Sequence, residues 1–106
     1  MNRVLAIAAL SLTATTAAWA VIPPGRAYDA AVACKGVSLI ATNAGDARSK
    51  AALRLIDVGI EKEIARGKTR DQAAADVEYA RYEYKDTTDQ AGIDAEWLKC
   101  LERWGG

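Results

Sequence analysis

The sequence predicts an all-α protein, a small four-helix bundle in which one disulfide joins the first helix to the last. Three observations support this prediction. Apolar residues recur at intervals of three or four in four successive stretches, and no stretch of strand length alternates apolar with polar residues. The only two cysteines of the 106-residue chain, Cys34 and Cys100, fall on the apolar stripes of the first and last of these stretches.

The first 20 residues have the form of an export signal. Residues 1–3, Met-Asn-Arg, form a short n-region made basic by Arg3. Residues 4–17 are an apolar run, and residues 18–20, Ala-Trp-Ala, form a small-x-small cleavage site. We therefore expect cleavage after Ala20 and a location in the bacterial periplasm. Two alternatives remain: cleavage after Ala27, and an uncleaved segment that anchors the chain in a membrane.

Signal cleavage leaves roughly 86 residues, which is a single small domain. We expect residues 21–28, which contain two prolines, to form an extended lead, and residues 29–104 to form the helical domain. So small a core needs a covalent cross-link, and an oxidising compartment favours a disulfide between Cys34 and Cys100. Two free buried thiols and a bridge between two chains are the alternatives.

The first two helices are predicted from caps and glycines. The first should run from about Asp29, a candidate N-cap, to Asn43. The second should span residues 46–66, with Gly59 marking a close crossing with another helix and Gly67 ending it as a residue of positive φ. Their apolar stripes are Ala30, Cys34, Val37 and Ala41 in the first, and Leu53, Ile56, Ile60 and Ile64 in the second.

The third helix has the clearest start. Residues 69–72, Thr-Arg-Asp-Gln, match a capping box in which Thr69 is the N-cap and Gln72 reaches back to it. This helix should end within the polar connection at residues 85–89, and the fourth should span about residues 92–104. Their apolar stripes are Ala73, Val77, Ala80 and Tyr84 in the third, and Ile93, Trp97, Cys100, Leu101 and Trp104 in the fourth.

Composition argues against catalysis and against polyanion partners. The chain has no histidine, which excludes imidazole bases and imidazole metal ligands, and two cysteines are too few for a structural zinc site. We therefore expect no enzymatic activity, no cofactor and no metal. Basic and acidic residues number 14 each, so we expect no nucleic-acid partner and no membrane association once the signal is removed.

Tyrosines on the third helix are the strongest surface candidates. With the apolar stripe turned inward, Tyr79 and Tyr82 share an outward or boundary face, close to Arg81. Tyrosine and arginine are the residues that dominate protein–protein hot spots. The alternative is that both rings lie flat against a thin core as ordinary packing.

Two cysteine-centred segments carry a family resemblance. They are residues 28–34, Tyr-Asp-Ala-Ala-Val-Ala-Cys, and residues 97–104, Trp-Leu-Lys-Cys-Leu-Glu-Arg-Trp. Together with the helical chain between them and residues 81–84, they resemble the periplasmic immunity proteins that neutralise peptidoglycan amidase effectors of type VI secretion. The resemblance implies a helical, homodimeric protein that occludes the substrate groove of a cell-wall amidase without any chemistry of its own.

The expected contact surface is the end of the third helix with the connection after it, residues 82–89, as a protruding loop. The residues assigned to partner binding are Tyr79, Tyr82, Glu83, Lys85, Asp86 and Asp89. Two other functions compete with this one. The first is a periplasmic stress chaperone that exposes apolar surface in acid. The second is an accessory module of an envelope assembly, which an uncleaved anchor would favour.

Overall fold

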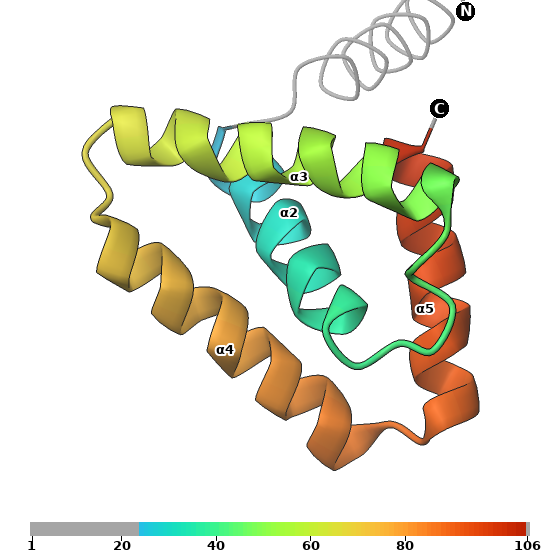
Figure 1. Ribbon diagram of the computed structural model, residues 1–106. Coiled ribbons are helices and arrows are strands. Elements are labelled where there is room, and N and C mark those ends of the chain that lie inside the picture. Colours follow the sequence, from blue (N-terminus) through green and yellow to red (C-terminus); the bar gives the residue numbers. More distant parts are fainter. Residues whose placement is uncertain (1–23, 106) are drawn as a thin grey trace, which may run out of the picture.

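The computed structural model describes residues 24–105 of the chain, which form four helices and no β-strand (Figure 1). The helices are α2, Pro24–Ser38; α3, Ala47–Ala65; α4, Arg70–Thr87; and α5, Gln90–Trp104. The all-α prediction is therefore confirmed. The predicted signal, residues 1–20, lies outside the described residues, and the alternative cleavage site after Ala27 falls inside α2.

Helix α2 is the centre of the fold, because it packs against all three other helices, whereas α4 and α5 barely contact each other. Figure 1 shows α2 framed by α3, α4 and α5. The buried residues of α2 point in several directions for this reason: Tyr28, Ala31, Val32, Cys34, Gly36 and Val37. A short helix with so much covered surface can hold a small domain together.

A disulfide between Cys34 and Cys100 joins α2 to α5, as predicted. The two Cα atoms are 5.8 Å apart, and both residues are buried. The bridge closes a loop between residues 66 positions apart. For a loop of this length the chain-entropy estimate of the stabilisation is about 4 kcal/mol, a large share of the stability of a small domain.

A buried hydrogen bond joins α3 to α5 on the other side of the core. The indole Nε1 of Trp97 donates to Ser49 Oγ at 2.9 Å, and both residues are fully buried. The Ser49 hydroxyl also lies 3.4 Å from the carbonyl oxygen of Asn43, to which it donates. The largest core side chain therefore has its polar atom satisfied, and this contact fixes how α3 and α5 are placed along each other.

The first helix begins and ends earlier than the sequence indicates. Residues 24–28 are helical rather than an extended lead, and Asp29 lies inside the helix instead of capping it. Pro24 is the first helical residue, a position where proline is favoured because the missing N–H would have no partner. At the other end the helix stops at Ser38. The connection to α3 is then held by Asp94, which accepts hydrogen bonds from the backbone N and the hydroxyl of Thr42.

Helices α3 and α4 begin where predicted, and the predicted cap of α4 is confirmed, whereas the cap of α3 was not predicted. Asp46 accepts from the backbone N of Ser49 at the start of α3, and Gly67 follows α3 with a φ of 122°. The capping box of α4 is complete, since Thr69 Oγ1 accepts from the Gln72 backbone and Gln72 Oε1 accepts from the Thr69 backbone. Local chain chemistry alone fixes these ends.

The close helix crossing lies at Gly36, not at Gly59. A Cβ on Gly59 would meet its nearest neighbours at 3.6 and 3.7 Å, which is ordinary contact. A Cβ on Gly36 would lie 2.8 Å from the backbone N of Arg81 and 2.9 Å from the Cβ of Ala80. Helices α2 and α4 therefore touch backbone to backbone, and only glycine fits at that position of α2.

Candidate functional site on α4

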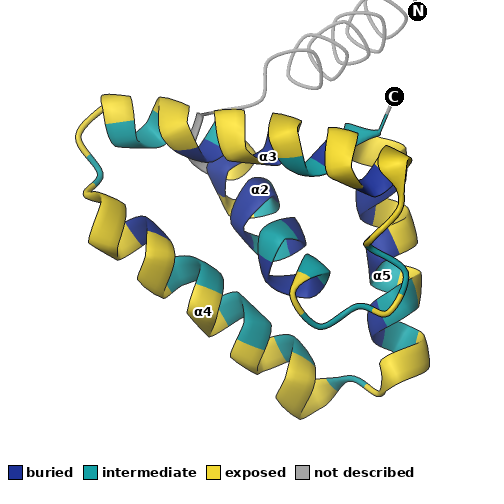
Figure 2. Ribbon diagram, in the orientation of Figure 1, coloured by how far each residue is buried: buried dark blue, intermediate teal, exposed yellow. Residues whose placement is uncertain are grey.

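Helix α4 is the most exposed of the four helices, which makes it the candidate binding surface. Its only buried residue is Ala73. Val77, Ala80 and Tyr84, predicted to face inward, are half-buried and pack against the core. In Figure 2 α4 is mostly yellow along its outer side, with teal and one blue segment toward α2. The predicted inner stripe of α4 is thus in place, and the opposite face is open.

Tyr79 and Tyr82 lie on that open face. Their side chains are 68% and 67% exposed, more than any other large apolar or aromatic residue in the described part. Helical spacing places Glu83 and Asp86 on the same side, and both are exposed. The structure thus brings these four predicted residues together on one helix face.

Charged neighbours surround both rings. The guanidinium of Arg81 lies 5.5 Å from the centroid of the Tyr82 ring, and it also forms an ion pair with Glu78. The carboxylate of Glu83, one turn after Tyr79, raises the pKa of the Tyr79 phenol through a hydrogen bond and its charge. Both rings therefore have charged groups beside them and still remain about two-thirds exposed.

Lys85 and Asp86 extend this surface toward the end of α4. Together with Arg81 and Tyr82 they line a shallow hollow of about 310 Å³. Both are exposed and form no ion pair with another described residue. A partner can therefore meet one free cation and one free carboxylate directly beside the Tyr82 ring.

Asp89 has a different role, and the protruding loop expected at residues 82–89 is absent. Helix α4 continues to Thr87, so only Thr88 and Asp89 separate it from α5. The Asp89 carboxylate accepts from the backbone N of Gly92 and caps α5, which starts two residues earlier than predicted. Asp89 is thus occupied by a structural contact, and the candidate surface is a helix face.

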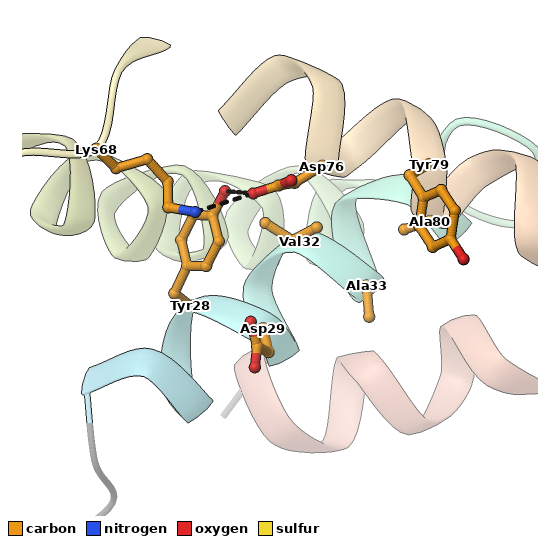
Figure 3. Close-up of a pocket in the computed structure, with 8 residues that line it drawn as sticks. All are labelled: Tyr28, Asp29, Val32, Ala33, Lys68, Asp76, Tyr79 and Ala80. Carbon is orange, nitrogen blue, oxygen red and sulfur yellow. Dashed lines mark hydrogen bonds and ion pairs between the residues drawn. The ribbon is translucent and has the colours of Figure 1, made fainter. Parts of the chain in front are cut away.

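A second hollow, of about 280 Å³, lies between α2 and α4 (Figure 3). One hydrogen-bonded cluster closes one side of it. The Tyr28 hydroxyl donates to Asp76 Oδ2 at 2.6 Å, and Lys68 Nζ donates to the same oxygen at 3.1 Å. Lys68 Nζ also lies 4.4 Å from the centroid of the Tyr28 ring. Tyr79 is among the residues that line the hollow, which connects it with the open face of α4.

The contacts within the cluster shift the pKa values of two of its members. The hydrogen bonds from Tyr28 and Lys68 lower the pKa of Asp76, while burial and the bond to Asp76 raise the pKa of Tyr28. The hollow is smaller than most sites for drug-sized ligands, and three of its polar residues, Tyr28, Lys68 and Asp76, are paired with one another. We interpret the cluster as a lock between α2 and α4. Sequence reasoning missed it, since Tyr28 and Asp76 are 48 positions apart and no local motif joins them.

No other chemistry emerges from the described residues. Residues 24–105 contain no group of three or more side chains suited to hold a metal ion, and none of their four helices is long and apolar enough to cross a membrane. Comparison of the chain with protein families, curated proteins and solved structures finds no match.

Proposed function

We propose that this protein is an exported inhibitor that binds a secreted peptidoglycan amidase and blocks its substrate groove. The observation that carries the proposal is the pair of aromatic rings, Tyr79 and Tyr82, left about two-thirds exposed on the open face of α4. Large exposed aromatic groups on a folded surface are typical of interaction sites.

The rigidity of the domain favours occlusion as the mechanism. The disulfide between Cys34 and Cys100 and the crossing at Gly36 hold α4 and α5 on α2. A face that is already ordered loses little conformational freedom on binding, so more of the contact energy contributes to affinity. Tyrosine adds to this because it offers a large contact area with few rotatable bonds. The inhibitor then acts by covering the groove.

Two further observations support the choice of partner and compartment. The segments around Cys34 and Cys100 resemble those of immunity proteins against amidase effectors, and a disulfide is the kind of cross-link found in oxidising compartments such as the periplasm. Among the described residues, no side-chain arrangement suggests catalysis. Binding is thus the simplest activity that this surface can have.

The test is inhibition of a purified amidase effector of type VI secretion, with purified peptidoglycan as substrate. We expect the wild-type protein to slow hydrolysis in proportion to its concentration. The double variant Tyr79→Ala/Tyr82→Ala should inhibit at least tenfold less well. Leu98→Ala is the matched control, because Leu98 is also an exposed apolar residue, 52% exposed, but lies on α5.

Two outcomes would contradict the proposal. One is a wild-type protein that leaves the amidase rate unchanged at any concentration. The other is a Leu98→Ala variant that loses as much inhibition as the double tyrosine variant, which would place the contact away from α4.

A further inference from the structure

The outer face of α3 carries an apolar strip that no other described element covers. Leu55 is 53% exposed and Val58 is 50% exposed. Three exposed alanines lie on the same side at helical spacing: Ala47, Ala51 and Ala65. At 1.5 Å per residue the strip extends for about 27 Å along the helix. Figure 2 shows the outer side of α3 in yellow along most of its length.

The acids and cations of α3 differ in whether they form ion pairs. All three acids of the helix form ion pairs with a cation: Asp57 with Lys35, Glu61 with Arg70, and Glu63 with Arg66. Four cations of α3 form no ion pair with any described residue: Arg48, Lys50, Arg54 and Lys62. All four are exposed. The unneutralised charge on this side of the molecule is therefore strongly positive, although the whole chain is balanced.

We propose that the outer face of α3 docks onto an anionic phospholipid surface. Helical spacing places the free cations Arg54 and Lys62 beside Leu55 and Val58. A soluble polyanion would engage the cations and leave the apolar side chains in water. A lipid surface accepts both, since anionic headgroups attract the cations and the boundary of the acyl chains takes the apolar groups.

This inference differs from the expectation that no membrane association remains after signal cleavage. In sequence the three acids of α3 offset most of its cations, so no cationic amphipathic pattern is visible. In the fold the charge of each acid is offset by a paired cation: Lys35, Arg70 or Arg66. The proposal does not depend on the amidase. The C-terminal end of α4 lies on the side of the molecule away from α3 (Figure 1), so a docked protein keeps the Tyr82 surface available.

The experiment uses residues 21–106, because the apolar signal would itself bind lipid. This shorter chain retains the whole described core, which lies between Tyr28 and Leu101. Cosedimentation is measured with vesicles of phosphatidylglycerol and phosphatidylcholine in equal parts, and with vesicles of phosphatidylcholine alone. We expect at least tenfold stronger binding to the anionic vesicles, falling steeply as salt is raised because the attraction is screened.

Matched variants locate the surface. Arg54→Glu should weaken binding to the anionic vesicles by roughly tenfold or more. Lys99→Glu makes the same change of net charge at an exposed position of α5 and should bind as the wild type does. Leu55→Ser keeps every charge and should weaken binding severalfold. Far-ultraviolet circular dichroism confirms that each variant stays helical.

Three results would overturn the proposal. Equal binding to both kinds of vesicle, or to neither, would remove the role of anionic lipid. Equal loss in Arg54→Glu and Lys99→Glu would reduce the effect to net charge. A wild-type chain that is dimeric in solution, fails to bind vesicles and becomes monomeric in Leu55→Ser would show that a second copy occupies this face.

Discussion

Helices α4 and α5 each carry one apolar stripe, but the stripe of α5 has larger apolar side chains, and the two helices are buried to different extents. Four residues of α5 are buried, and a disulfide and the hydrogen bond from Trp97 to Ser49 hold it in place. Helix α4 buries only Ala73, and it is held by the glycine crossing at Gly36 and the lock of Tyr28, Lys68 and Asp76. The domain thus has one helix committed to stability and one whose outer face is free for binding.

The largest expected effect on stability comes from breaking the disulfide that joins α5 to α2. Reducing the disulfide, or replacing Cys34 and Cys100 by serine, should lower the free energy of unfolding by about 4 kcal/mol. The measurement is urea denaturation followed by tryptophan fluorescence, with and without reductant. The double serine variant serves as the control, because reductant must leave its unfolding curve unchanged. Wild-type curves that coincide with and without reductant would show that the bridge adds nothing to stability.

The next largest effect tests how closely α4 packs against α2. Gly36→Ala places a Cβ less than 3 Å from the backbone of α4, so the helices must separate, at a cost of about 1–3 kcal/mol. Gly45→Ala is the matched control, because nothing lies within 4 Å of its Cβ position and its φ is negative. Thermal unfolding of the two variants should therefore differ clearly. Equal melting temperatures would mean that the crossing at Gly36 is loose.

The contrast between the two helices also separates what the sequence can predict from what it cannot. Local chemistry predicted the cap at Thr69 and the stop at Gly67, because each depends on residues within one turn. The apolar stripe of α5 and the disulfide also followed from spacing. The start of α2 was wrong, because proline is read as a helix breaker and only the fold shows that Pro24 opens the helix.

Features that depend on pairs distant in sequence could not be predicted. The sequence around Gly36 gives no sign of a close helix crossing, because its neighbour Ala80 lies far away in the chain. The acids of α3 look like free surface charges until Lys35 and Arg70 are brought beside them. The candidate site was predicted in part. The outward position of the two tyrosines follows from helical periodicity, whereas Asp89 was assigned to a protruding loop and is instead the N-cap of α5.

A smaller effect is expected in the pH dependence of stability. The lowered pKa of Asp76 means that its ionised form stabilises the fold above the unfolded value near 4, and that this contribution disappears as the pH falls through the folded-state pKa. We expect the wild type to lose stability between about pH 5 and pH 2. Asp76→Asn should lose part of that dependence, with the comparison made by urea denaturation at several pH values.

Glu102→Gln is the control for the acid experiment, since Glu102 is an exposed acid of α5 without an ion pair in the described part. Its pH dependence should match that of the wild type. If Asp76→Asn also matches the wild type, the lock between α2 and α4 does not respond to acid. A loosened α4 that binds unfolded clients at low pH would instead favour the stress-chaperone hypothesis.

The smallest effect on stability is expected at the proposed binding face itself. Tyr79→Ala/Tyr82→Ala should change the free energy of unfolding by no more than about 0.5 kcal/mol, because both residues are about two-thirds exposed. Tyr84→Ala is the matched control on the same helix, and it should cost about 1–2 kcal/mol because that ring packs against the core. Equal destabilisation by the two variants would mean that the outer rings are rim packing. A stable double variant that no longer inhibits the amidase would mean that α4 keeps them for a partner.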